Sequence, residues 1–107
     1  MASSPRPEVE IRPGDATELA PRYHLILLDD NDHSYEYVIE MLGAIFGYAV
    51  EKAFAIACAV DGTGRAIVET ASHERVSEHQ RAIHQFGPDP RIPRCRGSMS
   101  AVIEAAA

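Results

Sequence analysis

The residues best suited to chemistry form the acidic segment Asp29–Asp32, which contains three aspartates and an asparagine. This segment directly follows the apolar run Leu25–Leu28. Carboxylates beside apolar side chains are incompletely hydrated, so a cation that approaches them is favoured. Charge-assisted hydrogen bonds from an ammonium group to such oxygens contribute about 1.5–3 kcal/mol each. The segment therefore indicates a site for a cation with an apolar neighbour. A solvated turn that serves as a helix cap is the structural alternative.

Other reactive side chains do not have the spacing of a catalytic or metal site. His73, His79 and His84 are six and five residues apart, so no two of them share a helix face at chelating distance. The pattern D-x-N-x-H at residues 29–33 lacks the glycine and the distal glutamate of a calcium loop. Nothing marks a serine or cysteine as an activated nucleophile. We therefore expect no enzyme activity, no metal and no cofactor.

Hydrophobic periodicity places the elements on either side of the acidic segment. Residues 25–28 predict a short buried strand, and residues 33–46 follow the spacing of an amphipathic helix. Asp32 or His33 would cap this helix, and Gly47 would end it. The strand and the helix would therefore hold the acidic segment between them.

The rest of the chain predicts two more helices and two more strands. Residues 50–60 are rich in alanine and apolar on most sides, which predicts a largely buried helix. A turn at residues 61–64 leads to a strand at residues 66–68. Ser72 caps a third helix, and a loop rich in proline and arginine leads to a last strand at residues 101–103. The inward stripe of the third helix is expected to contain Val76, His79, Ile83 and Phe86. The order β-α-α-β-α-β predicts an α+β fold with helices on one face of a small sheet.

Composition narrows the class of partner. The 107-residue chain has a formal charge of −6, which disfavours nucleic acid and anionic membranes because both reward lysine and arginine. Residues 1–21 hold four of the seven prolines, so we expect a flexible extension there and one domain over residues 22–107. Cys58 lies in an apolar run and predicts a buried thiol, and its distance from Cys95 disfavours a disulfide framework. No apolar run approaches the roughly 20 residues of a membrane span.

Three stretches of the chain are informative in combination: YHLILLDD at residues 23–30, EYV at 36–38 followed by YAVEKA at 48–53, and AVDGTGRA at 59–66. In this order they resemble the ClpS family, the adaptor that delivers substrates to the Clp AAA+ chaperone–protease. The resemblance covers about residues 23–86. It implies a three-stranded antiparallel sheet with helices on one face, similar to the ribosomal L7/L12 C-terminal domain.

ClpS proteins hold the free α-amino group of a substrate's N-terminal residue and bury its large hydrophobic side chain. They then dock on the N-terminal domain of a ClpA- or ClpC-type AAA+ unfoldase. The resemblance thus implies a cytoplasmic, monomeric and non-enzymatic adaptor for N-degrons, with no nucleic acid or membrane partner. The alternative is a ClpS-fold interaction module without amine recognition.

The resemblance also assigns roles to individual positions. The positions that would accept the α-ammonium group are Asp29, Asp30 and Asp61. The positions that would line the hydrophobic pocket are His33, Tyr35, Val38, Met41 and Ala57. The positions that would contact the chaperone are Glu74 and His79.

Several of these positions depart from the family's residues. Asp29 replaces an asparagine and Asp61 replaces a histidine, so the site could be an all-carboxylate cradle or one whose like charges repel. Ala57 replaces a larger side chain and would deepen the pocket, whereas Tyr35 and His33 would narrow its mouth. The family's Thr-Pro helix start is missing, and a lysine of the docking side is replaced at position 79.

Overall fold

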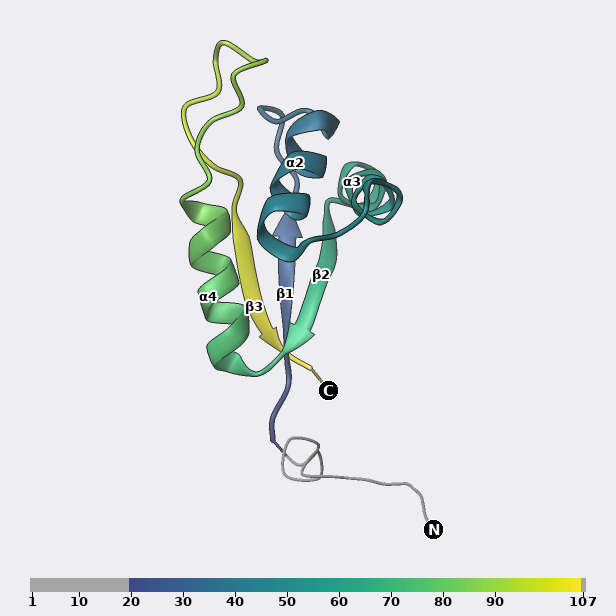
Figure 1. Ribbon diagram of the computed structural model, residues 1–107, viewed down its shortest axis with the longest axis vertical. Coiled ribbons are helices and arrows are strands. Elements are labelled where there is room, and N and C mark those ends of the chain that lie inside the picture. The colour runs from purple at the N-terminus through teal and green to yellow at the C-terminus, as the bar shows by residue number, and fades with distance from the viewer. Residues whose placement is uncertain (1–19, 107) are drawn as a thin grey trace.

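The structure is a computed structural model that describes residues 20–106 (Figure 1). The extension predicted over residues 1–21 lies almost wholly outside the described residues. Element labels follow Figure 1. The described elements are the strands β1 (Tyr23–Leu28), β2 (Arg65–Ala71) and β3 (Ala101–Ala105) and the helices α2 (Tyr35–Phe46), α3 (Val50–Thr63) and α4 (His73–His84). The predicted order β-α-α-β-α-β is confirmed. No helix among residues 20–106 is long and apolar enough to span a membrane.

The three strands form one antiparallel sheet in the order β2-β1-β3. Leu25 and Leu27 of the central strand are fully buried and form one core cluster with residues of the three helices. The ribbon in Figure 1 shows how these helices are arranged around the sheet. Ile26 points to the other face, where its cross-strand partners are Ile67 and Val102. The α+β fold class with helices on one face of an antiparallel sheet is therefore confirmed.

The apolar side chains of the helices close the core over this sheet. Each helix contributes residues at spacings of three, four or seven, as expected of an amphipathic helix. The buried core residues of the helices are Tyr37, Val38, Met41, Leu42, Ala53, Ala57, Val60, Val76 and Ile83. Full burial of one such aliphatic side chain contributes about 1.5–3 kcal/mol, so this layer holds the three helices on the sheet.

Helix α2 begins one residue later than the cap that the sequence predicts. Ser34, rather than Asp32 or His33, has the extended N-cap conformation, and its hydroxyl accepts a hydrogen bond from the Tyr37 backbone N–H. The Asp32 carboxylate is bound by an arginine of a later loop instead. Gly47 ends the helix in the left-handed conformation with φ of 73°, which confirms the predicted stop.

Helix α3 is longer and more exposed than predicted. It continues through residues 61–63, which were expected to form a turn, and the Thr63 hydroxyl donates to the Ala59 carbonyl in the last turn. Gly64, with φ of 90°, ends it. Phe54 is 49% exposed and the Cys58 thiol is exposed, so the predictions of a largely buried helix and a buried thiol are wrong. Only one stripe of α3 faces the core.

Helix α4 starts at the predicted cap, where the Ser72 hydroxyl accepts from the Arg75 N–H. It ends at His84, so Phe86 lies beyond the helix, and its ring packs edge-on against the Tyr37 ring. Residues 87–100 then form an irregular segment, here called the Arg-rich loop. This loop returns the chain to the beginning of α2, at the top of Figure 1.

Candidate functional site

The predicted amine-binding residues lie at the end of the sheet where β1 stops and α3 ends. The Asp29 backbone N–H donates to the Gly64 carbonyl at 3.0 Å, and Leu28 pairs with Arg65 across the strands. These contacts join the segment after β1 to the last turn of α3, which carries Asp61. Asp29, Asp30 and Asp61 are thereby brought to one end of the molecule.

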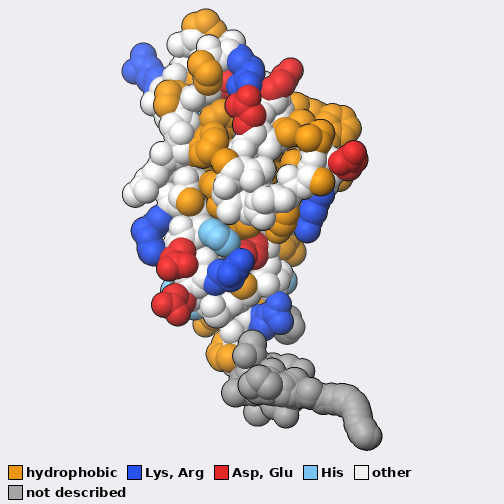
Figure 2. Space-filling view, viewed as in Figure 1, with side chains coloured by type: hydrophobic (Ala, Val, Ile, Leu, Met, Phe, Trp, Pro, Cys, Tyr) orange, Lys and Arg blue, Asp and Glu red, His pale blue; other side chains and the backbone are white. Residues whose placement is uncertain are grey.

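Tyr35 and Asp61 join the first turn of α2 to the last turns of α3. The Tyr35 hydroxyl donates to Asp61 Oδ2 at 2.7 Å, and its ring packs edge-on against Phe54 with centroids 5.7 Å apart. The hydrogen bond to the Asp61 carboxylate raises the pKa of Tyr35 to about 12. Tyr35 is therefore held as a neutral donor across the outer face of α3, where apolar side chains gather on the surface (Figure 2). We call this contact the Tyr35 latch.

Asp30 is held by its own segment. Its Oδ1 accepts from the Asp32 N–H at 2.9 Å and from His33 Nδ1 at 2.8 Å. The Asp30 side chain remains 36% exposed, whereas that of His33 is only 4% exposed. His33 lies beneath the acidic corner, against Asp30 and the Arg-rich loop. A carboxylate has about four acceptor positions, so Asp30 keeps capacity for a further donor.

The Arg-rich loop neutralises part of the acidic segment, a pairing that the sequence analysis did not predict. Arg94 Nε donates to Asp32 Oδ1 at 2.7 Å, and another nitrogen of Arg94 donates to the Asn31 carbonyl. Arg91 binds both Asp89 and Glu40. The loop's high arginine content, opposite a run of acids, was the available signal. Among the aspartates of this segment, Asp29 is the one whose carboxylate has no side-chain partner among residues 20–106.

Asp89 anchors the Arg-rich loop to the start of α2. Its side chain is buried, and its Oδ2 accepts from both the N–H and the hydroxyl of Ser34, each at 2.7 Å. Its Oδ1 accepts from Arg91. Burial opposes ionisation, but the Ser34 and Arg91 hydrogen bonds outweigh it and hold the pKa of Asp89 well below its usual range. The buried carboxylate therefore completes the cap of α2.

The predicted walls of the hydrophobic pocket lie in the core between α2 and α3. Val38, Met41 and Ala57 are 4%, 0% and 3% exposed. Tyr35, the other predicted wall on α2, lies at the surface side of this seam with its hydroxyl on Asp61. Tyr35 is partly buried and packs against the core cluster to which these three residues belong.

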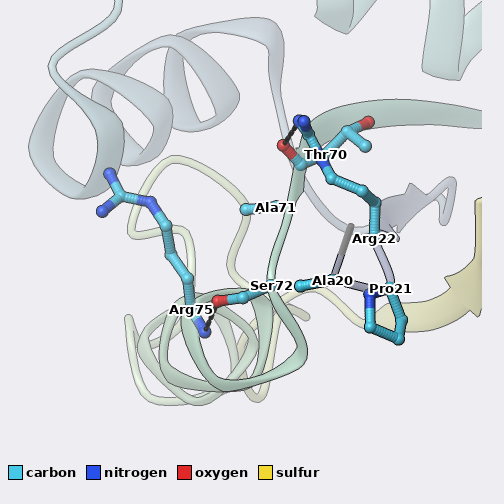
Figure 3. Close-up of a pocket in the computed structure, with 7 residues that line it drawn as sticks. All are labelled: Ala20, Pro21, Arg22, Thr70, Ala71, Ser72 and Arg75. Atoms are coloured by element: carbon cyan, nitrogen blue, oxygen red, sulfur yellow. Dashed lines mark hydrogen bonds between the residues drawn. The ribbon is translucent and has the colours of Figure 1, made fainter. Parts of the chain in front are cut away.

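A surface pocket of about 280 Å³ lies at the opposite end of the sheet (Figure 3). It is formed where β1 begins, β2 ends and α4 starts. The residues that line it are Ala20, Pro21, Arg22, Thr70, Ala71, Ser72 and Arg75. None of them belongs to the predicted amine or hydrophobic site.

The two predicted chaperone contacts differ in accessibility. Glu74 is exposed in the first turn of α4. His79 is half-buried, with its Nδ1 2.6 Å from Glu69 Oε1 and its ring packed edge-on against Phe46. The other Glu69 oxygen accepts from Arg75 Nε at 2.8 Å. Basic, acidic and histidine side chains lie together on the lower half of this face (Figure 2).

The fold and its acidic end define a class: small α+β domains with three antiparallel strands and helices on one face. The model of the family described as ATP-dependent Clp protease adaptor protein ClpS matches residues 18–90, more than half of the chain. The chain therefore belongs to the ClpS family, which is a family of adaptors and not of proteases.

A relative and a solved structure show how far this likeness extends. The ATP-dependent Clp protease adapter protein ClpS of Ruegeria sp. (strain TM1040) is 38% identical over 58 residues, which cover 54% of this chain and 51% of that protein. The match thus spans about half the length of that relative. Agrobacterium tumefaciens ClpS2, solved with bound L-phenylalaninamide, has a TM-score of 0.69 at 16% identity and covers 80% of this chain and 98% of its own. This second likeness shows the fold.

Proposed function

We propose that the protein binds the N-terminal residues of substrate proteins and delivers them to a Clp AAA+ unfoldase for degradation. One observation carries the proposal: in a ClpS-family chain, three carboxylates lie at one end of the sheet beside the apolar seam between α2 and α3. The structural neighbour ClpS2 is described with L-phenylalaninamide, which has a free α-amino group and a large apolar ring. That ligand chemistry suits a carboxylate cluster next to apolar side chains.

The α-ammonium group would be held by Asp29, Asp30 and Asp61. An ammonium group presents three N–H donors and one positive charge, so it needs several acceptors that are fixed in space. Asp30 is fixed by the Asp32 N–H, and Asp61 is fixed by the Tyr35 hydroxyl. Each of these carboxylates keeps unused acceptor positions. The two contacts therefore preorganise the acceptors without exhausting them.

The ligand's side chain would enter the seam between α2 and α3. Tyr35 swings away from Phe54 and opens a path to the buried side chains Val38, Met41 and Ala57. Ala57 is small, so it would leave room for a large apolar side chain once Tyr35 has moved. The latch makes entry conditional, because the Tyr35 ring would have to leave its contact with Phe54 before the ligand's side chain could enter.

The docking surface for the N-terminal domain of a ClpA- or ClpC-type unfoldase would lie on α4. Glu74 is exposed and can pair with a cation of the partner. His79 is bound to Glu69 within the same chain, so it would add less to docking. We expect the protein to carry out this delivery as a cytoplasmic monomer.

Fluorescence anisotropy with labelled peptides tests amine recognition. Peptides that begin with Phe, Leu, Trp or Tyr are titrated beside N-acetylated copies, which keep the side chain but lose the charge. We expect saturable binding to free amines that acetylation abolishes. Asp30→Asn should weaken binding more than Asp29→Asn, because Asp30 keeps the family's residue. If free and acetylated peptides bind alike, amine recognition is wrong.

A second function is favoured by the internal pairing of the acidic segment. Asp32 is bound by Arg94 and Asp30 by His33, so much of its negative charge is already neutralised. The chain could then act as a ClpS-fold interaction module that binds a partner protein without amine recognition. Binding of the full chain to an unfoldase N-terminal domain, reduced by Glu74→Ala but unaffected by Asp30→Asn, together with no peptide binding, would favour this function.

A further inference from the structure

One imidazole ring links the acidic corner to the Arg-rich loop. His33 Nδ1 lies 2.8 and 2.9 Å from the two Asp30 carboxylate oxygens. His33 Nε2 lies 2.7 Å from the Gly97 carbonyl oxygen. Carboxylate and carbonyl oxygens only accept hydrogen bonds, and a neutral imidazole has a single N–H. Both contacts can therefore form together only when His33 is an imidazolium with a proton on each nitrogen.

The surroundings of His33 accommodate such a cation. Its side chain is 4% exposed, so its charge needs a partner, and the Asp30 carboxylate supplies one. From α2 the Tyr37 ring packs against it with centroids 4.5 Å apart. From the Arg-rich loop Cys95 Sγ lies 3.3 Å from Nε2.

The charged groups one step further out are already paired with each other. Asp32 is bound by Arg94, and Asp89 is bound by Ser34 and Arg91. Asp30 is therefore the carboxylate that His33 faces directly. The family match ends at residue 90, so the Gly97 end of this link lies outside the matched segment.

We infer that His33 is a positioning residue of the proposed amine site, and that its protonation couples this site to the Arg-rich loop. The imidazolium fixes the orientation of the Asp30 carboxylate and, through Gly97, anchors the loop against the start of α2. The inference rests on the proposed function and adds a control by pH to the same site.

The direction of that control follows from the two contacts. When His33 loses one proton, a ring nitrogen's lone pair faces either the Asp30 carboxylate or the Gly97 carbonyl at less than 3 Å, and that contact breaks. Either loss loosens Asp30 or the loop that supports it. Amine affinity should therefore fall as the pH rises and the imidazolium is lost.

A comparison with His33→Gln isolates this effect from ionisation of the ligand. Glutamine supplies an amide N–H donor but does not titrate, and the same Phe-initiated peptide is used for both proteins. Anisotropy titrations from about pH 5.5 to 8 give the ratio of the two affinities at each pH. The effect of ionisation of the peptide's own amine cancels in this ratio, because the same peptide is used for both proteins. We expect the wild type to bind several-fold more tightly at the acidic end and the ratio to approach one at the basic end. A constant ratio would overturn the inference.

Two measurements on the free protein separate this inference from the proposed function. Nitrogen-15 NMR of the imidazole rings reports whether both His33 nitrogens carry protons near pH 6. Alkylation by iodoacetamide, resolved by mass spectrometry, compares Cys95 with the exposed Cys58 as an internal reference. We expect a doubly protonated His33 and a several-fold increase in Cys95 alkylation in His33→Gln. Asp30→Asn, with His33 intact, should lower the pH at which the ring loses its second proton.

The outcomes distinguish the two claims. If no peptide binds but the NMR and alkylation results are as expected, the proposed function fails and the histidine link stands as a structural element only. The link is overturned if His33 has one protonated nitrogen near pH 6 in the wild type. It is also overturned if Cys95 reacts at the same rate in the wild type and in His33→Gln, or if Asp30→Asn leaves the His33 titration unchanged.

Discussion

Asp89→Asn is the substitution for which the structure gives the most definite expectation. The buried Asp89 carboxylate accepts hydrogen bonds on both oxygens, from the Ser34 N–H and hydroxyl on one and from Arg91 on the other. Every partner of this side chain is a donor. An asparagine at this position would keep one accepting oxygen and turn its amide nitrogen, itself a donor, toward one of these donor pairs.

The expected loss of stability follows from the hydrogen bonds that an asparagine amide cannot accept. At least one charge-assisted hydrogen bond is lost, worth about 1.5–3 kcal/mol, and a buried donor is left without an acceptor. The weakened cap of α2 adds about 0.5–2 kcal/mol. The two contributions overlap, because Ser34 is both the N-cap residue and a donor to Asp89. We therefore expect the free energy of unfolding to fall by about 2–4 kcal/mol. In a domain of this size that corresponds to a drop in Tm of roughly 10–25 °C.

Urea denaturation followed by circular dichroism measures this change, and Glu40→Gln is the matched control. Glu40 binds the same Arg91 but is exposed, so its loss should change the stability by at most about 1 kcal/mol. If Asp89→Asn is no more destabilising than Glu40→Gln, the assignment of Asp89 as the anchor of the helix cap is incorrect.

The same carboxylate should make the stability depend on pH. A carboxyl whose pKa is lower in the folded state than in the unfolded state stabilises the fold above its unfolded pKa and loses that contribution as the pH falls. Because the pKa of Asp89 is lowered by Ser34 and Arg91, the wild type should lose stability as the pH falls below about 3.9. Asp89→Asn should show a smaller loss over this range, which urea titrations at several pH values would detect.

Three further substitutions test other parts of the site. Asp61→Asn should lower the pKa of Tyr35 from about 12 toward the ordinary tyrosine value of about 10, which an ultraviolet absorbance titration of the tyrosines would measure. An unchanged titration curve would mean that the Tyr35 latch is absent in solution. Ala57→Met should lower the free energy of unfolding by about 1–3 kcal/mol, because the larger side chain overpacks the core. Unchanged stability together with weaker peptide binding would mean instead that a pocket beside Ala57 is open in the free protein. Arg94→Ala should change the free energy of unfolding by at most about 1 kcal/mol, because the ion pair between Arg94 and Asp32 is exposed. A much larger decrease, measured by urea denaturation, would show that the Arg-rich loop depends on this ion pair.

The helices and strands were predictable because the spacing of apolar residues along the chain indicates them. Val38, Met41 and Leu42 follow the spacing of one helix face, and all three are buried. Ser72 and Gly47 were recognisable as a cap and a stop from residue type alone, because local backbone geometry requires a hydroxyl acceptor or a positive φ at such positions. These features depend on neighbours within a few residues.

The features that were missed depend on distant contacts. Ser34 caps α2 with help from Asp89, which is 55 residues away in sequence. His33 lies beneath Asp30 because Gly97, 64 residues away, accepts from its second nitrogen. Local patterns report nothing about such partners. The extension of α3 through Asp61 was missed for the opposite reason, since the sequence DGTG has strong turn propensity but the helix tolerates it at its end.

The candidate site falls between these cases. The resemblance selected Tyr35 and Asp61 as separate members of the site, one for the pocket and one for the amine. That the two side chains bond to each other follows from how α2 crosses α3, which residue types do not reveal. The assignment of Val38, Met41 and Ala57 to an apolar wall stays a prediction, and the structure adds that all three are buried and that Tyr35 packs against the same core.

The strand order β2-β1-β3 also determines when the fold can be completed during synthesis. β1 is made first, yet it is the central strand, and one edge of it stays unpaired until β3 has been made. The acceptors that complete the start of α2 lie in the Arg-rich loop, which is made just before β3. A nascent chain that stops at the end of α4 would therefore expose an apolar strand edge and an incomplete helix cap, the features that favour aggregation. Contacts between distant segments also slow folding, so the last twenty or so residues should limit the rate at which this domain forms.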